Sequence, residues 1–279
     1  MSDSVQAKRA AFRALHEQGC FVLPNPWDVG SARMLQGLGF QALATTSSGH
    51  AWSLGRPDGT ASRAAILEHV RSLVEATELP VNLDFEDGFA QHPEGVAESV
   101  RLAIATGVAG VSIEDSTGDP AQPVRDLDDS IARVRAARSA IDASGEDVLL
   151  VGRAENFFLG RPDLADTIKR LQAYAEAGAD CLYAPGIRTR EQIAAVVAAV
   201  APRPVNLLVG SPIGLTLAEI AELGVRRISI GGGLARAAWG GFLRAARSIA
   251  QEGRFDALGE ATPGTELNTF FRQFADHRA

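Results

Sequence analysis

Acidic side chains gather in the stretch Val81-Asn-Leu-Asp-Phe-Glu-Asp-Gly88. Its apolar residues alternate with polar ones, which predicts a short strand that ends at the turn signal Asp87-Gly88. Because residues two apart on a strand share a face, Asp84 and Glu86 are predicted to point the same way. Neighbouring carboxylates repel each other unless a proton or a cation intervenes, and oxygen ligands suit Mg²⁺ or Mn²⁺ better than zinc. A solvated acidic strand end is the alternative interpretation of this stretch taken alone.

Short apolar segments recur along the chain, with amphipathic helical segments between them. The predicted strands are Cys20–Pro24, Ala42–Thr46, Val81–Glu86, Gly110–Glu114, Val148–Arg153, Cys181–Ala184, Val205–Val209 and Arg227–Ile230. Strands separated by helices pair in parallel through right-handed crossovers. This pattern predicts an α/β fold of the (β/α)8 TIM-barrel type.

Helical segments are also predicted outside this repeating unit. One precedes the barrel over residues 4–18, and another follows the last strand from Gly240 to about Glu252. The barrel with its N-terminal helix is predicted to span residues 1–254. Residues 255–279 would form a C-terminal extension, whose aromatic cluster of Phe270, Phe271 and Phe274 is expected to dock on the barrel or on a neighbouring subunit.

Polar residues follow nearly every predicted strand, where the active groups of such barrels lie. The strand ends read Asn25-Pro-Trp-Asp28, Thr45-Thr-Ser-Ser-Gly49, Asp84-Phe-Glu-Asp87, Glu114-Asp115, Arg153-Ala-Glu-Asn156, Pro185-Gly186, Asn206 with Gly210-Ser211, and Gly231-Gly-Gly233. An acid-rich ring with one arginine fits a divalent cation together with bidentate binding of a carboxylate.

Composition excludes several classes of function. The 279 residues carry a net charge of −7 without a basic cluster, so nucleic acid is not an expected partner. No apolar run is long enough to cross a membrane, no signal peptide opens the chain, and two cysteines in apolar segments make a disulfide framework unexpected, so we expect a cytoplasmic protein. Lys8 and Lys169, the only lysines, are not at strand ends and offer no Schiff-base nucleophile.

Five motifs in register resemble the isocitrate lyase/phosphoenolpyruvate mutase superfamily. They are Asn25-Pro-Trp-Asp-Val-Gly-Ser-Ala, Ser53-Leu-Gly-Arg-Pro-Asp-Gly59, Asp84-Phe-Glu-Asp-Gly88, Ser112-Ile-Glu-Asp115 and Gly152-Arg-Ala-Glu155. The resemblance covers about residues 20 to 250. It implies a (β/α)8 barrel, Mg²⁺ (or Mn²⁺), and small α-keto or 2-hydroxy acid substrates that react through an enolate-like intermediate. It also implies homo-oligomers, dimers or tetramers, in which the last barrel helix is exchanged between subunits.

The resemblance also implies roles for individual residues. Asp84 is similar to the direct metal ligand, and Glu86, Glu114 and Asp58 to the carboxylates that hold the metal's waters. The catalytic group would comprise Arg153, which grips the keto acid, and Thr46, Ser47 and Ser48, which cradle the substrate carboxylate and enolate oxygen. Trp27, Asn206 and Glu155 would complete the substrate pocket.

Several of these residues have structural alternatives. Asp58 also suits a turn, Glu114 a helix cap, and Trp27 simple packing. Gly231-Gly-Gly233 resembles a phosphate-binding loop but equally suits a tight turn from strand to helix.

The stretch Ser116-Thr-Gly-Asp-Pro-Ala-Gln-Pro123 departs from the family. It lacks the cysteine of the isocitrate lyase loop and the lysine and asparagine of the phosphonopyruvate-handling members. We therefore expect a Mg²⁺-dependent lyase or decarboxylase acting beside a small α-keto acid. The alternatives are P–C bond chemistry on phosphonopyruvate-like substrates and a non-catalytic α-keto acid binding protein.

Overall fold

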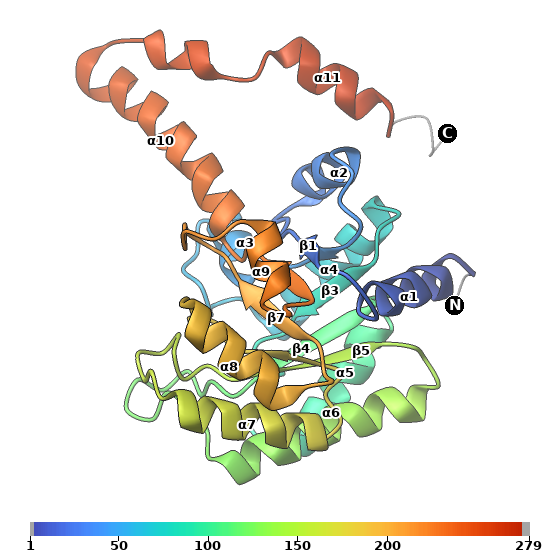
Figure 1. Cartoon of the computed structure of the whole chain (residues 1–279). Coiled ribbons are helices and arrows are strands. Elements are labelled where there is room, and N and C mark those ends of the chain that lie inside the picture. Colours follow the sequence, from blue (N-terminus) through green and yellow to red (C-terminus); the bar gives the residue numbers. More distant parts are fainter. Residues whose placement is uncertain (1–2, 275–279) are drawn as a thin grey trace.

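The computed structural model of the chain describes residues 3–274. Eight parallel strands form a nearly closed barrel in the order β1-β8-β7-β6-β5-β4-β3-β2, with helices around it (Figure 1). The two ends of this order approach each other, since Ala44 N of β2 donates a 3.0 Å hydrogen bond to Pro24 O just after β1. The (β/α)8 barrel predicted from the sequence is confirmed.

Each strand lies within its predicted range. The bounds are β1 (Phe21–Leu23), β2 (Leu43–Ala44), β3 (Val81–Asp84), β4 (Gly110–Glu114), β5 (Leu149–Arg153), β6 (Cys181–Tyr183), β7 (Val205–Leu208) and β8 (Arg227–Ser229). The prediction that β3 extends to Glu86 is wrong. After Asp84 the chain turns, with Gly88 N bonded to Phe85 O at 2.9 Å and with Glu86 at φ +47°. Strand alternation therefore does not determine where Glu86 points.

Helices follow the strands around the barrel. Their bounds are α1 (Asp3–Leu15), α2 (Val29–Gly37), α3 (Ser47–Ser53), α4 (Arg63–Ala76), α5 (Pro93–Ile104), α6 (Leu127–Ser144), α7 (Leu164–Glu176), α8 (Arg190–Val200), α9 (Leu217–Glu222), α10 (Gly233–Glu252), the 3-10 helix η1 (Asp256–Glu260) and α11 (Gly264–Arg272). Helix α10 begins seven residues before the predicted start at Gly240. The helix also includes the turn before Gly240 and continues through Gly240 and Gly241 despite their low helix propensity. Within residues 3–274, no helix is long and apolar enough to cross a membrane.

Side chains inside the barrel are largely polar near its carboxyl end. On β3, Val81 and Leu83 belong to the main apolar core, whereas Asn82 and Asp84 line the cavity at the barrel mouth. Asn82 donates to Ser112 Oγ at 3.0 Å. This alternation explains how one short strand supplies both core packing and site chemistry.

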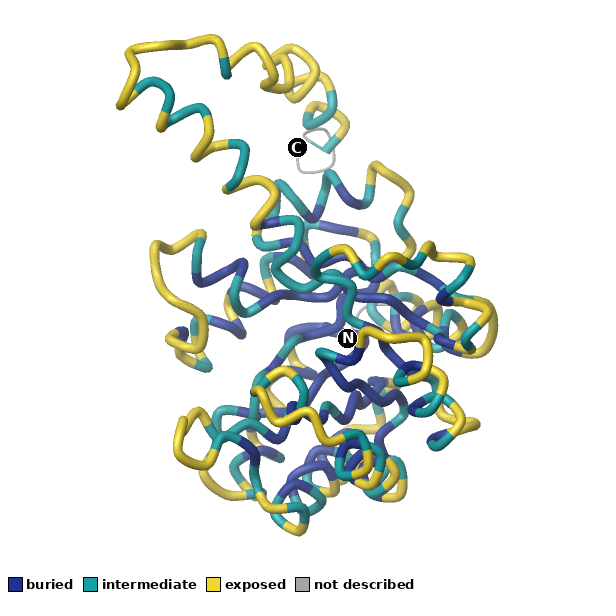
Figure 2. The backbone as a smooth tube through the Cα atoms, turned by 60° about the vertical axis from the view of Figure 1, so that its left-hand side comes forward, coloured by how far each residue is buried: buried dark blue, intermediate teal, exposed yellow. Residues whose placement is uncertain are grey.

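The C-terminal segment forms an arm that leaves the barrel along α10 and returns through η1 and α11 (Figures 1 and 2). At its far end Phe270 packs so closely on Gly37 of α2 that no larger side chain would fit there, and Arg33 lies 5.3 Å from the ring centre of Phe274. The extension thus contacts its own barrel. Of the predicted extension, residues 275–279 lie outside the described part of the chain.

Candidate functional site

Two adjoining cavities open at the carboxyl end of the strands, with volumes of about 530 and 650 Å³. Both are lined by Ser47, Asp58, Arg153 and Phe158. The first also contains Asp84, Thr46 and Ser48, and the second contains Glu86, Glu114 and Glu155. The structure therefore brings nine of the eleven sequence-predicted site residues to one place.

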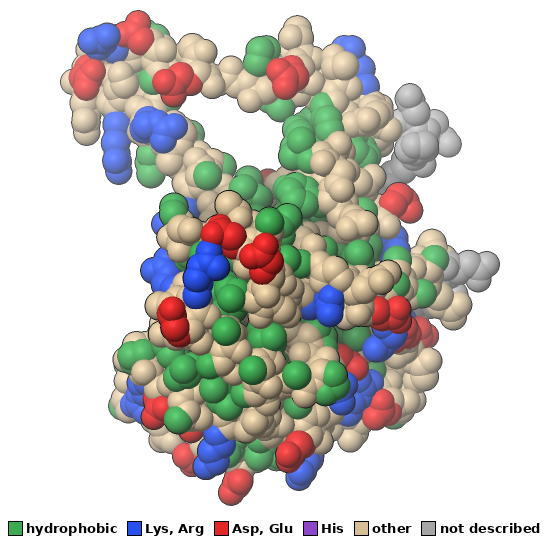
Figure 3. Space-filling model, in the orientation of Figure 1, with side chains coloured by type: hydrophobic (Ala, Val, Ile, Leu, Met, Phe, Trp, Pro, Cys, Tyr) green, Lys and Arg blue, Asp and Glu red, His purple; other side chains and the backbone are tan. Residues whose placement is uncertain are grey.

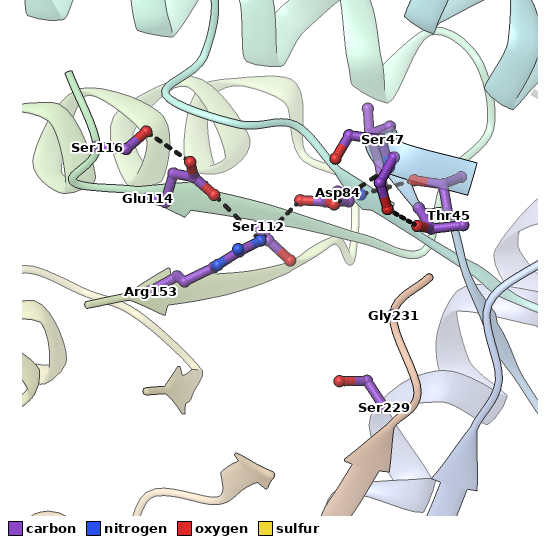
Figure 4. Close-up of polar contacts among 12 residues, drawn as sticks. Thr45, Ser47, Asp84, Ser112, Glu114, Ser116, Arg153, Ser229 and Gly231 are labelled. Carbon is purple, nitrogen blue, oxygen red and sulfur yellow. Dashed lines mark hydrogen bonds and ion pairs between the residues drawn. The ribbon is translucent and has the colours of Figure 1, made fainter. Parts of the chain in front are cut away.

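Arg153 is the centre of the polar contacts (Figure 4). Its Nη1 lies 3.1 Å from Asp84 Oδ1 and 3.0 Å from Glu114 Oε2, and its Nε and Nη2 donate to the two oxygens of Glu155. The guanidinium also lies 5.1 Å from the ring centre of Tyr183. Burial lowers the pKa of Arg153, but Glu114, Glu155 and Asp84 together raise it well above its usual value. Arg153 is thus a fixed cation among carboxylates.

Asp84 is held by the residues that follow β2. Its backbone N–H donates to Thr45 Oγ1 at 2.8 Å, and its Oδ2 accepts from Ser47 N at 3.4 Å. Thr46 caps α3, since its hydroxyl accepts from Gly49 N at 3.3 Å and lies 3.1 Å from Ser48 Oγ. The start of α3 therefore places the Thr46–Ser48 segment beside the carboxylate of Asp84.

Glu114 and Glu86 lie further toward the second cavity. Glu114 is not a helix cap, because its oxygens meet Ser116 Oγ at 2.6 Å and Arg153, while Asp126 holds the N-cap position of α6. Burial, opposed by Arg153 and reinforced by Asp84, raises the pKa of Glu114. Burial and then the charges of Asp84 and Glu114 raise the pKa of Glu86 to about 8.

Asp58 lies on the exposed turn before α4, and its Oδ1 accepts from Gly59 N at 3.0 Å. This is the contact of a turn residue. Desolvation raises the pKa of Asp58, a hydrogen bond from Ser47 opposes that rise, and the charge of Asp84 adds to it. The turn and site interpretations of Asp58 are therefore compatible.

Trp27 and Asn206 are the two predicted pocket residues that do not line either cavity. Half-buried Trp27 packs behind α3 at Gly49. Asn206 is fully buried lower in the barrel, where it accepts from Arg227 Nε at 2.8 Å and donates to Ser229 Oγ at 2.9 Å. Both residues contact elements that line the site rather than the cavity itself.

Sequence reasoning did not select several residues that line the first cavity, among them Asn25, Asn82, Trp52, Arg188 and Arg236. Asn25 ties three strands together, because its amide donates to Thr45 O and its Oδ1 accepts from Ile230 N and Gly231 N. Its position at a predicted strand end was an available signal. The two arginines lie beyond the strand ends, where strand periodicity gives no information.

Gly231–Gly233 form a tight turn from β8 into α10. Gly231 has φ +55°, and a Cβ on Gly232 would lie 2.8 Å from Ser48 Oγ and 3.0 Å from the Trp52 ring. Glycine is therefore required for the turn to approach α3 closely. The turn interpretation of these glycines explains their presence without a phosphate.

The donor set suits a hard divalent cation. Five carboxylates (Asp58, Asp84, Glu86, Glu114 and Glu155) line the two cavities together with Arg153, and Glu86 Oε1 is buried without a hydrogen-bond partner among residues 3–274. Within residues 3–274 no three acidic, histidine or cysteine side chains converge as direct ligands. Mg²⁺ keeps several waters and needs only one or two direct carboxylates, so the residues fit such an ion bound largely through water.

Residues of the 116–123 segment line the second cavity. The segment is tied back by a bridge between Ser116 and Val124 and by Arg125 Nε donating to Ser116 O at 3.1 Å. Asp119 is its one ionisable side chain; it is exposed and accepts from Ala121 N at 2.8 Å. The segment supplies no buried proton donor.

The profile of the family described as phosphoenolpyruvate phosphomutase matches residues 12–250. The chain belongs to the isocitrate lyase/phosphoenolpyruvate mutase superfamily. A crystal structure of a putative lyase/mutase from Burkholderia cenocepacia J2315 has a TM-score of 0.94 and 49% identity, covering 97% of this chain and 98% of that one.

Curated relatives agree with this membership. An uncharacterized protein of Mycobacterium tuberculosis (strain ATCC 25618 / H37Rv) is 36% identical, covering 79% of this chain and 81% of its own. Oxaloacetate decarboxylase of Paraburkholderia xenovorans (strain LB400) is 29% identical, covering 79% and 74%. The superfamily comprises lyases and decarboxylases of small keto acids and phosphonate mutases, and the chain is a carbon–carbon lyase of this general type.

Proposed function

We propose that the protein is a Mg²⁺-dependent lyase or decarboxylase that breaks a C–C bond beside the carbonyl of a small α-keto or 2-hydroxy acid. The observation that carries the proposal is the position of Arg153, buried among Asp84, Glu114 and Glu155 and next to the start of α3. When bound, the divalent cation would stabilise the negative charge that develops on the enolate oxygen. Asp84 is the proposed direct ligand, with Glu86, Glu114 and Asp58 acting through waters.

The chain's own residues would orient the substrate. Arg153 presents a planar guanidinium whose pairing with carboxylates in this structure shows that carboxylate groups fit around it. A substrate carboxylate would replace part of that pairing as the acidic residues turn to the cation. The backbone and hydroxyl groups of Thr46, Ser47 and Ser48 would hold the carboxylate and the enolate oxygen from fixed positions.

The 116–123 segment decides which bond cleavage is favoured. Cleavage of isocitrate releases a carbanion-like fragment that must be protonated, and a general acid typically contributes about 10²–10⁴-fold to such a step. Asp119 is exposed, and no other side chain of the segment is ionisable. Loss of CO₂ from oxaloacetate needs no acid at the leaving group, so a segment without an ionisable, buried side chain favours decarboxylation over isocitrate cleavage.

The test is to incubate the protein with Mg²⁺ and either oxaloacetate, isocitrate or methylisocitrate, while following pyruvate, glyoxylate and succinate. Oxaloacetate turnover should exceed the background measured with Asp84→Ala protein and should stop with EDTA. Isocitrate turnover at about 1 s⁻¹ or above, a rate ordinary for enzymes, would contradict the assignment. An absence of turnover with every acid that binds would favour the non-catalytic alternative.

P–C chemistry is a second candidate because Arg188 and Arg236 line the first cavity. A phosphonyl group requires cationic partners, and the 116–123 segment offers none. Phosphonopyruvate belongs in the same assay, with phosphate and phosphoenolpyruvate as the products to follow. Faster conversion of phosphonopyruvate than of oxaloacetate would favour this candidate.

We also propose that the protein is a homo-oligomer, a dimer or tetramer that exchanges its C-terminal helix. Trp239 and Phe242 on α10 and Phe255 beyond it are exposed, by 40%, 59% and 64% of their surfaces. In the space-filling view an opening separates the arm from the barrel (Figure 3). An apolar arm held away from the barrel suits a helix of a neighbouring subunit.

A further inference from the structure

Three arginines besides Arg153 line the first cavity. Arg227 is buried and hydrogen-bonded to Asn206 and Asn82, whereas Arg188 and Arg236 are exposed. Arg188 lies on the connection between β6 and α8, and Arg236 lies in the first turn of α10. Within residues 3–274 neither side chain has a carboxylate at ion-pair distance, and both are exposed to the cavity opening. The cavity is therefore acidic at Asp58 and Asp84 but has unpaired positive charge elsewhere on its wall.

Arg188 differs from its neighbours in how it is held. Its Nη2 donates to Ser211 Oγ on the segment after β7, and its backbone N–H donates to Gln192 Oε1 at 2.9 Å. Arg190, only two residues further along the chain, pairs with Glu219 on the surface and does not line the cavity. Arg188 is thus tethered by a neutral hydroxyl that leaves its charge available.

An unpaired arginine in a cavity is suited to an anionic group. The planar guanidinium binds a carboxylate through two parallel hydrogen bonds. Because a hydroxyl already holds the arginine side chain in place, the side chain loses less conformational freedom when a ligand binds. Phe157, Ile187 and Leu208 line the same cavity and offer apolar contact for a hydrocarbon chain. The charge of Arg153 is already balanced by three carboxylates, whereas the charge of Arg188 is not.

We propose that Arg188, positioned by Ser211, is a specificity residue that binds a second carboxylate of the substrate. The substrates are then dicarboxylic keto or hydroxy acids rather than monocarboxylic acids such as pyruvate. This rests on the proposed function, in which Arg153 binds the first carboxylate. The second carboxylate of the substrate would then be recognised by the segments after β6 and β7, not by the 116–123 segment.

The test is titration calorimetry in Mg²⁺ with pyruvate, oxalate and 3,3-difluorooxaloacetate, the last being a dicarboxylate whose fluorines prevent enolisation. Arg188→Met should weaken binding of the difluoro acid by about tenfold or more, which corresponds to about 1.4 kcal/mol. Pyruvate should bind within about twofold of wild type, because its single carboxylate pairs with Arg153 and none is left for Arg188. Oxalate should behave in the same way, because its two directly bonded carboxylates take the places of the carboxylate and carbonyl of a keto acid. Ser211→Ala should weaken the same ligand less, because Arg188 remains.

Arg190→Met is the matched control, since it removes a guanidinium of the same segment outside the cavity and should leave all three affinities unchanged. Equal loss of pyruvate and of the difluoro acid in Arg188→Met, or no loss of either, would overturn the proposal. If Arg188→Met weakened the binding of phosphonopyruvate alone in a parallel titration, the group bound by Arg188 would be a phosphonate, and the proposal of a second carboxylate would be overturned.

These titrations do not depend on turnover. Arg188-dependent binding without cleavage of any acid would leave this inference standing and remove the proposed function. If wild type and Arg188→Met cleaved oxaloacetate with equal kcat/KM, the proposed function would stand and this inference would be removed. Failure of the wild-type protein to bind any of the acids would overturn both.

Discussion

Nη1 of Arg153 lies 3.1 Å from Oδ1 of Asp84, so the proposed substrate-binding cation and the proposed metal ligand form an ion pair across the barrel mouth. Asp84 ends β3 and Arg153 ends β5, with β4 and its terminal Glu114 between them. Each charge offsets the cost of placing the other in a partly desolvated site. A cation bound at Asp84 would release Arg153 to a substrate carboxylate, which links metal binding to substrate binding.

Asp84→Ala should remove Mg²⁺ binding while the fold remains, because the proposed direct ligand is lost and the remaining carboxylates act through waters. Titration calorimetry with Mg²⁺ measures the effect, and circular dichroism verifies the fold. Asp128→Ala on the exposed first turn of α6 is a control of equal charge change. Unchanged Mg²⁺ affinity in Asp84→Ala would place the metal elsewhere.

Arg153→Lys should weaken oxalate or pyruvate binding by about tenfold or more, since lysine cannot present the planar fork that a carboxylate accepts. The ammonium group also cannot reach Asp84, Glu114 and Glu155 together. Arg138→Lys, which alters a cation paired with Asp142 and Asp180 away from the cavities, should bind both acids like wild type. Equal affinity in Arg153→Lys and wild type would remove Arg153 from the site.

The fold and the acidic half of the site were predictable because both follow from periodicity. Parallel strands place all their carboxyl ends at one end of the barrel, so Asp84, Glu114 and Arg153 had to meet there. Glu86 reaches the same place by a different route, through a turn with positive φ that alternation cannot foresee.

The cationic part of the first cavity was not predictable in this way. Arg188 lies five residues after β6 ends, and its direction depends on the turn at Pro185-Gly186 and on Ser211 of another connection. Arg236 depends on α10 starting at Gly233 rather than at Gly240. Loop and helix-start geometry are set by tertiary contacts, which a single strand pattern does not encode.

His69 should make the folded protein sensitive to acid. Its ring stacks on that of His50, with 3.7 Å between the two ring centres. Burial and then the charge of His50 lower the pKa of His69 to about 3. The unfolded chain has a histidine pKa of about 6.5, so between these values it binds a proton that the folded protein does not. Stability is therefore complete above about pH 6.5 and falls as the pH decreases, by about 2 kcal/mol between pH 7 and pH 5 for one such group.

Thermal unfolding of wild type and His69→Leu across pH 4.5–7.5 measures this contribution. Between neutral and low pH, the Tm of the variant should decrease less than the Tm of wild type, whatever its stability at neutral pH. His92→Gln is the control, since His92 is exposed and its side chain makes no capping hydrogen bond. The same pH slope in wild type and His69→Leu would show that protonation of His69 does not limit stability; His16, whose pKa is also lowered to about 3 by burial and Arg227, would be the next candidate.

Phe242→Lys should dissociate the proposed oligomer. Phe242 contacts Trp239 edge-to-face at 5.5 Å on the exposed side of α10, and a lysine there would place charge in the apolar contact between subunits. Light scattering after size exclusion should give a multiple of the 29.4 kDa chain for wild type and a smaller mass for the variant. Leu102→Lys on α5, a similar change on an exposed leucine of the barrel, should keep the wild-type mass. A wild-type mass equal to one chain would show that the exposed face of α10 is not a subunit interface.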